Sequence, residues 1–351
     1  MEEARVLVPF ESARTGRNGR NHVPDRILNP ASRQHSWHSS CRGSTHEGWS
    51  GGHRPLGPHG AWARIGPSRR SRAVGVWGRP PEEAGRLASA LDATAYDDYA
   101  VMLGDVDAVA FAVPPDIQAE MALQAASAGK HLLLDKPDRI RCDCGTSVGG
   151  QRKEHGVASV VFFTDRFVYV SRAWFDDVQQ ADGWLGGWMR WLSALDEPGN
   201  PFGASVWRQE RGALWDTGPH ALSTLSAALG PIDSLVAVAG AGDLVTLTLR
   251  HLPGATSTAT LSQFAPPAAV CFEGAVWGRE GFSVMPSRPE NSQVDAMRVA
   301  AQELATAARS GQPHELDVGF GARVVELLAD RRPSWTASEP KAQHADLSSS
   351  G

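Results

Sequence analysis

The chain has 351 residues, of which 42% are apolar, and this is enough for two domains of ordinary size with real cores. A net charge of -5 gives no reason to expect a nucleic acid as partner, and no apolar run approaches the ~20 residues of a membrane span. Four cysteines do not make a disulfide framework and no secretory signal opens the chain, so we expect a cytoplasmic protein.

Residues 11–72 lack the hydrophobic periodicity of the remaining sequence. The segment contains half of the histidines and no lysine, together with scattered arginine, serine, glycine and proline. Such a composition buries too little apolar surface to offset the entropy lost on ordering. We therefore expect residues 1–46 to be disordered or foreign to the fold, and the polar tail at 334–351 to be disordered.

Strands and helices alternate from Ala73 onward. The expected elements are, in chain order, a strand at 73–77, a helix at 81–91, strands at 106–113 and from 131, with a helix at 117–128 between them, and a strand at 157–163. Alternation with short links predicts a doubly wound parallel sheet, the α/β Rossmann arrangement, over residues 47–163. Ligands bind such a sheet at the carboxyl ends of its strands.

Residues 138–153 interrupt this alternation where a helix is expected. Lysine is rare and arginine common throughout, as in GC-rich coding DNA, and such DNA translated in a wrong frame yields arginine, glycine, proline, serine and histidine. A frame displaced by one nucleotide permits a helical segment here. Over residues 46–64 it permits a start codon, a short apolar strand and G-T-G-H-W-A, a dinucleotide-binding fingerprint. We predict frameshifted segments within 1–72 and 138–153; the alternative is a genuine low-complexity extension.

The second half of the chain is rich in short β-strands. The expected elements are, in chain order, a helix at 221–229, strands at 235–239, 243–251, 256–263 and 270–277, and helices at 295–309 and 318–331. This order predicts an α+β domain over residues 164–333 with a large, mainly antiparallel sheet.

Asp216 and His220 stand four residues apart at the expected start of a helix, so their side chains can share one face. Histidine titrates near neutrality and can exchange a proton with a hydroxyl while a hydride moves to or from the adjacent carbon. The carboxylate can orient the imidazole or bind a neighbouring hydroxyl. Taken alone, the pair is also explained by a helix cap and a core histidine, and Lys136 by a solvated turn.

Three motifs resemble one enzyme family. The sequences VDAVAFAVPPDIQ at 106–118 and AGKHLLLDKP at 128–137 are similar to the hallmark of the glucose–fructose oxidoreductase/inositol dehydrogenase/rhizopine catabolism (Gfo/Idh/MocA) family. In that family the second strand usually ends in Glu-Lys-Pro, and Asp135 stands here in place of the glutamate. RGALWDTGPH at 211–220 resembles the family element G-G-x-L-x-D-x-G-x-H, with Arg211 replacing the first glycine.

The resemblance implies an NAD(P)-dependent oxidoreductase that acts on a sugar, an inositol or a related polyol and pairs its subunits through the sheet of the second domain. It places Lys136, His220 and Asp216 in the catalytic site, with Lys136 stabilising negative charge on the substrate oxygen. Arg166, Trp207 and Arg208 are the expected substrate-binding residues, and no metal is implied. The expected cofactor-binding residues are Gly78, Arg79, Val113, Pro114, Pro115, Gln118, Asp135 and Pro137.

Arg79 bears on the choice of cofactor. An acid at the end of this strand would bind the ribose hydroxyls of NAD, whereas an arginine suits the 2′-phosphate of NADP, so we favour NADP over NAD. The phosphate-binding loop is a difficulty, because the fingerprint positions carry Gly52, Arg54 and Gly57, and Arg54 blocks the close approach of backbone to pyrophosphate.

Two alternative functions follow from these features. The damaged loop favours a catalytically inert family member that acts as a binding or regulatory subunit. A biliverdin-reductase-like enzyme would share the first domain without needing Asp216 and His220.

Overall fold

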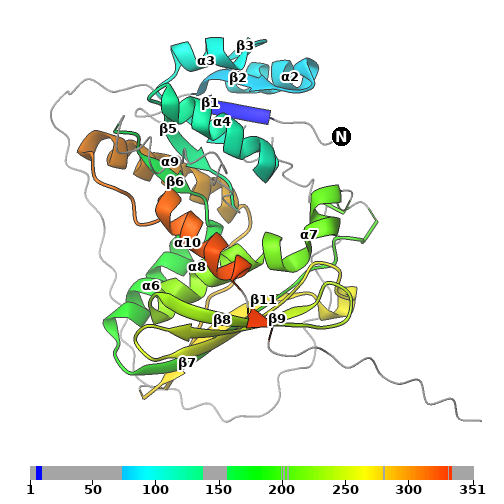
Figure 1. The fold of residues 1–351 in the computed structure, drawn as a ribbon, viewed down its shortest axis with the longest axis vertical. Coiled ribbons are helices and arrows are strands. Elements are labelled where there is room, and N and C mark those ends of the chain that lie inside the picture. The colour runs from blue at the N-terminus through cyan, green and yellow to red at the C-terminus, as the bar shows by residue number, and fades with distance from the viewer. Residues whose placement is uncertain are drawn as a thin grey trace, which may run out of the picture.

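The computed structural model describes residues 5–9, 73–136 and 156–333, apart from residues 199, 201, 204, 280 and 331. These residues form a six-stranded and a seven-stranded sheet, with helices between them (Figure 1). The predictions made for Pro137, for residues 10–72 and 138–153 and for the tail at 334–351 lie outside the described residues.

The six-stranded sheet has the strand order of a Rossmann fold. Its strands are, in spatial order, β3 (Thr94–Tyr96), β2 (Ala73–Gly78), β1 (Arg5–Pro9), β4 (Ala108–Phe111), β5 (His131–Leu134) and β6 (Ser159–Val161). Strand β2 runs parallel to β3, and β4, β5 and β6 run parallel to one another. The linking helices are α2 (Pro81–Leu91), α3 (Tyr99–Asp105) and α4 (Pro115–Ser127). The prediction of a doubly wound sheet is therefore confirmed.

The apolar runs fold as strands because helices cover both faces of this sheet. Every residue of β4 is buried, as expected of a central parallel strand. Helix α3 begins where the Asp98 carboxylate accepts hydrogen bonds from the amides of Ala100 and Val101, at 2.6 and 3.1 Å. Helix α2 has a proline in its first turn, where no backbone donor is lost.

Strand β1 differs from its neighbours in direction. It lies between β2 and β4 and runs antiparallel to both, so that Arg5 pairs with Gly78 and Pro9 with Ala73. Its carboxyl end therefore lies at the amino end of β2. The segment expected to be disordered thus contributes the central strand, in a direction opposite to that of a Rossmann fold.

The seven-stranded sheet is mixed and mostly antiparallel. Its strands are, in spatial order, β12 (Gly281–Val284), β11 (Cys271–Gly278), β7 (Trp184–Leu192), β10 (Thr256–Ser262), β9 (Val245–His251), β8 (Ile232–Ala239) and β13 (Arg332–Pro333). Strands β7 and β10 pair in parallel, as do β8 and β13. The α+β prediction is confirmed, although β7, an interior strand between β11 and β10, was not predicted.

Helices cover one face of this sheet and connect it to the first domain (Figure 1). They are α6 (Tyr169–Gln180), α7 (Val206–Asp216), α8 (Gly218–Leu229), α9 (Ser292–Ser310) and α10 (Val318–Ala329). Helix α8 packs against β7 and β10, whereas α9 returns to β5 and β6. Almost every residue of α8 is buried, because the helix is enclosed between the sheet and its neighbouring helices. Among the described residues, no helix is long and apolar enough to cross a membrane.

The other face of the sheet carries exposed apolar side chains near β11 and β12. Trp277 pairs with Phe282, and both side chains are about half exposed. Val284, two residues farther along β12, is 61% exposed. Arg190 and Glu273 form an ion pair between the neighbouring strands β7 and β11. We call Trp277, Phe282 and Val284 the sheet patch.

Candidate active site

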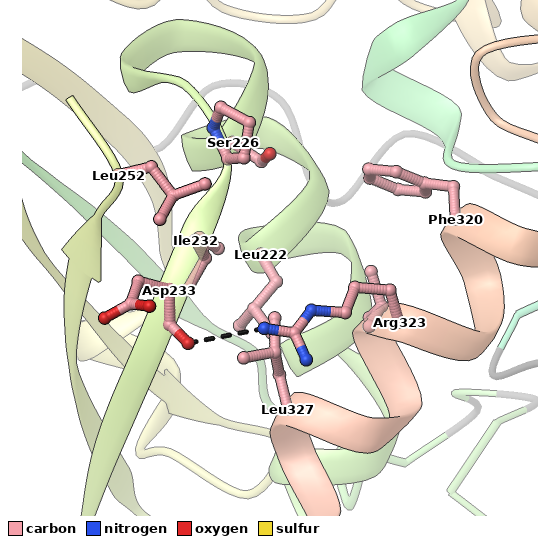
Figure 2. Close-up of a pocket in the computed structure, with 10 residues that line it drawn as sticks. Leu222, Ser226, Ile232, Asp233, Leu252, Phe320, Arg323 and Leu327 are labelled. Carbon is pink, nitrogen blue, oxygen red and sulfur yellow. Dashed lines mark hydrogen bonds between the residues drawn. The ribbon is translucent and has the colours of Figure 1, made fainter.

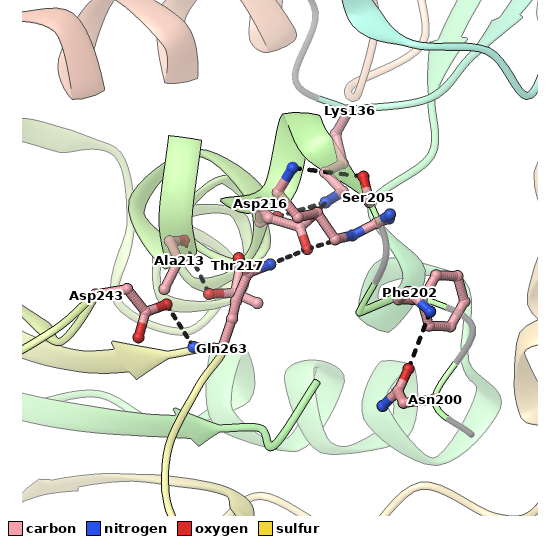
Figure 3. Close-up of polar contacts among 10 residues, drawn as sticks. Lys136, Asn200, Phe202, Ser205, Ala213, Asp216, Thr217, Asp243 and Gln263 are labelled. Carbon is pink, nitrogen blue, oxygen red and sulfur yellow. Dashed lines mark hydrogen bonds and ion pairs between the residues drawn. The ribbon is translucent and has the colours of Figure 1, made fainter. Parts of the chain in front are cut away.

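Lys136 connects the two domains at the carboxyl end of β5. Its Nζ donates hydrogen bonds to the backbone carbonyl and to Oδ1 of Asp216, the last residue of α7 (Figure 3). The two side chains are only 10% and 12% exposed. A solvated turn does not explain a buried lysine that is paired in this way, so the structure brings together two of the predicted catalytic residues.

The Asp216 carboxylate is held by three donors. Besides Lys136, the Nε of Arg208 lies 3.1 Å from Oδ2, and the side-chain amide of Gln263 donates to the same oxygen. Burial on its own would raise the pKa of Asp216, but the charges of Lys136 and Arg208 overcome this effect and hold the pKa below its usual value. Asp216 is therefore an anion that fixes Lys136, and the hydrogen bonds of its carboxylate are committed to protein donors.

His220 lies in the first turn of α8, in aromatic surroundings. The ring of Trp191 is 5.5 Å away and that of Phe163 is 6.2 Å away, edge-on. Burial lowers the pKa of His220 well below its ordinary value, and the charges of Lys136 and Arg288 lower it further. The imidazole is therefore neutral at physiological pH and able to accept a proton.

Asp216 and His220 do not share one helix. Asp216 ends α7, Thr217 follows, and α8 begins at Gly218. Within α7 the chain turns at Gly212, whose φ of 64° and ψ of -173° suit only glycine. The turn brings Arg208 back onto Asp216, eight residues later. The sequence spacing was interpreted as the start of one helix and missed the break between α7 and α8.

The predicted cofactor-binding residues that the structure describes, which are all but Pro137, lie at the carboxyl edge of the first sheet. Gln118, which is 1% exposed, donates to the carbonyl of Asp135 at 2.7 Å and accepts from its amide at 2.9 Å. This reciprocal pair fixes the start of the turn that carries Lys136. Burial raises the pKa of the Asp135 carboxyl against the opposing effect of Lys136. Gly78 ends β2 and Arg79 follows it, whereas Val113 and Pro114 lie between β4 and α4 and Pro115 begins α4.

These residues fit only part of a dinucleotide. The turns after β2, β4 and β5 lie at one edge, where the nicotinamide and adenosine ends of a bound dinucleotide meet a Rossmann sheet. The pyrophosphate requires a glycine-rich loop after a parallel central strand. Because β1 runs in the opposite direction, its carboxyl end is at the wrong edge, and no described residue supplies that loop.

The predicted substrate-binding residues lie in different places. Arg208 is in the site, and its guanidinium lies 4.9 Å from the ring of Phe202. Arg166 pairs with Glu315 at 2.9 Å, and no described contact joins it to Lys136, Asp216 or His220. Trp207 is half-buried in α7 and makes no described ring contact.

Sequence reasoning missed three residues that contact or influence Asp216 and His220. Trp191 lies on β7, which was not predicted, and Gln263 follows the last residue of β10. Arg288 forms a bidentate ion pair with the buried Asp165, and its guanidinium lies 4.0 Å from the ring of Phe272. Of these three residues, only Gln263 gave a signal in the sequence, as a polar residue at the end of an expected strand.

A separate hollow of about 250 Å³ lies on another side of α8. Leu222, Ser226 and Phe320 line it, and Arg323 donates to the carbonyl of Asp233 at 3.3 Å (Figure 2). Leu222 is about 200° around the helix from His220. None of the predicted site residues lines the hollow, which is distinct from the candidate site.

Residues 57–161 match the model of an oxidoreductase family with an NAD-binding Rossmann fold, the Gfo/Idh/MocA family. The chain carries the nucleotide-binding domain of this family. An uncharacterized oxidoreductase of Synechocystis, sll0816, is 29% identical over 181 residues, or 48% of this chain and 47% of that protein. The match thus spans about half the length of this curated relative.

Solved structures share the fold of both domains. Levoglucosan dehydrogenase, in complex with NADH and levoglucosan, has a TM-score of 0.61 and 17% identity over 73% of this chain and 86% of its own. An NAD-binding oxidoreductase from Klebsiella pneumoniae has a TM-score of 0.62 and 18% identity over 74% and 86%. An Agrobacterium radiobacter oxidoreductase in complex with NAD⁺, L-tartaric acid and magnesium has a TM-score of 0.61 and 16% identity over 74% and 87%. The chain is thus similar to oxidoreductases of the Gfo/Idh/MocA type in its nucleotide-binding segment and in its fold.

Proposed function

We propose that this Gfo/Idh/MocA protein transfers a hydride between a nicotinamide cofactor and a secondary alcohol or carbonyl of a sugar, an inositol or a related polyol. The observation that carries the proposal is the buried Lys136–Asp216 pair, beside a histidine kept neutral. A cation and a proton acceptor within electrostatic reach of one another suit the oxidation of a hydroxyl, in which a proton leaves oxygen as a hydride leaves carbon.

Each side chain has a separate task in this reaction. When bound, the nicotinamide supplies the hydride acceptor. The neutral His220 takes the hydroxyl proton, and Lys136 donates a hydrogen bond to the oxygen, stabilising the charge that develops on it. Asp216 keeps Lys136 in place, and Arg208 positions the substrate. In the reverse direction the protonated His220 returns the proton to the oxygen.

The finer features of substrate and cofactor rest on other observations. Arg79, exposed after β2, supports NADP over NAD. A sugar-like substrate is supported by the levoglucosan bound to one structural neighbour, and the tartaric acid bound to another also carries secondary hydroxyls. The cytoplasmic location remains a prediction from composition.

The first test is turnover by the full chain. A panel of sugars, inositols and polyols is incubated with NAD⁺ or NADP⁺, and reduced nicotinamide is followed by absorbance. Lys136→Met should lower kcat about 10²- to 10³-fold through loss of a donor to the developing charge. Lys130→Met, at the opposite end of β5, is the matched control and should retain activity. Full activity of Lys136→Met would rule out the proposed role of Lys136.

One observation favours the catalytically inert alternative, namely the reversed direction of β1. A protein that lacks the pyrophosphate loop would keep the two-domain fold without turnover. Binding of NADH or NADPH, measured by nicotinamide fluorescence, distinguishes the two functions, because the inert protein should leave the fluorescence unchanged.

We also propose that the partner of the open sheet face is a second copy of this chain. The sheet patch is apolar and continuous with a charged pair, which is a suitable composition for a self-complementary surface.

A further inference from the structure

Gln263 is a buried glutamine that contacts the Asp216 carboxylate. It directly follows β10, and it is 1% exposed. Its Nε2 donates to Oδ2 of Asp216, the oxygen that does not contact Lys136 (Figure 3). Gln263, from the second domain, and Lys136, from the first, thus contact different oxygens of the Asp216 carboxylate.

The main chain of Gln263 is fixed on both sides. Its amide donates to Oδ2 of Asp243 at 2.7 Å, and its carbonyl accepts from the amide of Leu195 at 2.8 Å. The other oxygen of Asp243 accepts from Ser262 Oγ at 2.6 Å. Asp243, which lies just before β9, therefore clamps the end of β10, and the glutamine side chain starts from an anchored backbone.

The orientation of the side-chain amide follows from its neighbour. Asp216 is ionised, so only the NH₂ of Gln263 can face it; the carbonyl would repel the carboxylate. In this orientation Oε1 is buried and has no partner among the described residues. A buried acceptor without a partner costs free energy, so the contact with Asp216 is retained despite that cost.

We propose that Gln263 is a positioning residue, which holds Oδ2 of Asp216 so that Oδ1 stays on Lys136. Arg208 approaches Oδ2 through Nε alone. A guanidinium prefers to bind both oxygens of a carboxylate, and without Gln263 the carboxylate can rotate to satisfy that preference. Oδ1 would then leave Lys136. The catalytic consequence of this arrangement rests on the proposed function, whereas the contact itself does not.

Two substitutions at this position make the proposal testable. Gln263→Met removes the donor at similar volume. Gln263→Glu keeps the shape but puts a second carboxylate against Asp216, and two adjacent carboxylates raise the pKa of one of them. When protonated, the introduced carboxyl group can donate to Asp216 as the amide does; when ionised, it repels Asp216. A raised pKa in the folded state means that stability is present at low pH and lost as pH rises through that pKa.

Denaturant unfolding of the full chain tests the contact without any substrate. We expect the stability of Gln263→Glu, relative to Gln263→Met, to fall as pH rises, and the double variant Gln263→Glu/Asp216→Asn to recover stability because the amide and the carboxylate exchange places. Gln180→Glu, on the exposed end of α6, is the control and should show neither effect. Equal losses for both variants at every pH, with an additive double variant, would overturn the proposal.

Kinetics test the consequence. If the chain turns over a polyol, Gln263→Met should lower kcat about 10- to 100-fold with KM nearly unchanged, as expected when a catalytic group is misplaced. Gln263→Glu should be active only at low pH, a signature that general loss of structure does not produce. Absence of turnover by the unaltered chain would contradict the proposed function and would leave the unfolding result to decide the role of Gln263.

Discussion

His220 shows how single residues set the chemistry of this site. Three charged groups influence it: Lys136 and Arg288 lower its pKa, and Asp216 raises it. The rings of Phe163 and Trp191 add no compensating charge. Because burial acts in the same direction as the two cations, the neutral imidazole prevails, and it is the form that can accept a proton from an alcohol.

This balance predicts a pH profile. In alcohol oxidation the active form of His220 is the neutral one, so kcat should stay constant as pH falls through 6.5, the ordinary pKa of histidine, and decline only below it. Arg288→Met removes one cation and should move this decline to higher pH. The measurement is kcat against pH for both proteins. A decline centred at or above 6.5 in the unaltered chain would contradict the proposed state of His220.

At the residue scale, sequence predicted the groups that carry motifs and missed those that support them. Lys136, Asp216 and His220 stand at recognisable spacings. Gln263 directly follows β10 and Arg288 lies between β12 and α9, both far along the chain, so their roles depend on how the chain packs. Arg166 was predicted to bind substrate from the family resemblance alone. The contact with Arg288 is made instead by the adjacent residue, Asp165.

Among the elements, α7 depends most on a single backbone conformation. Gly212→Ala places a side chain at a φ of 64° and a ψ of -173°, which should cost about 1–3 kcal/mol and displace Arg208 from Asp216. Gly85→Ala, inside α2 where an added Cβ meets nothing within 4 Å, is the matched control and should stabilise the fold by about 0.5–1 kcal/mol. Denaturant unfolding measures both. Equal stability of the two variants would show that the turn tolerates other residues.

The sheet patch makes a prediction about assembly. If a second copy covers Trp277, Phe282 and Val284, then Phe282→Asp should convert the oligomer into a monomer, because a charge is buried at an apolar interface. Val101→Asp, at an exposed position on α3, should leave the assembly intact. Light scattering after size-exclusion chromatography gives the mass of each. A monomeric unaltered chain would contradict this role of the sheet face.

Most elements of both domains could be predicted because their hydrophobic patterns are strong. The buried run of β4 and the alternation along β9 are examples. Strand β7 was missed because its tryptophans and glycines follow no simple alternation. The glycines at 186 and 187 leave room for the neighbouring strands, because an added Cβ at either would meet a backbone carbonyl at 2.9 Å. Requirements of this kind appear only once the strands are assembled.

For the whole molecule, the central question is the strand between β2 and β4. The position needs a strand to complete the sheet, and Arg5–Pro9 fills it by pairing antiparallel with both neighbours. Such pairing satisfies the backbone hydrogen bonds of β2 and β4 but brings no loop to the carboxyl edge. The pair of Lys136 and Asp216, with His220 under their electrostatic influence, is thus described together with a sheet edge at which no described residue supplies a pyrophosphate loop.

The predicted displacement of the reading frame would resolve this mismatch, and it can be tested. Restored over residues 46–64 and 138–153, it should supply a parallel apolar strand followed by G-T-G-H-W-A, whose glycines allow the backbone to approach the pyrophosphate. We expect the restored protein to quench or enhance NADPH or NADH fluorescence on binding and the present sequence to do neither. Sequencing the coding DNA is the independent check. Error-free DNA in the present frame, together with cofactor binding by the present chain, would contradict the frameshift. If neither protein binds cofactor, the first domain is a scaffold, and partner proteins should then be sought instead of substrates.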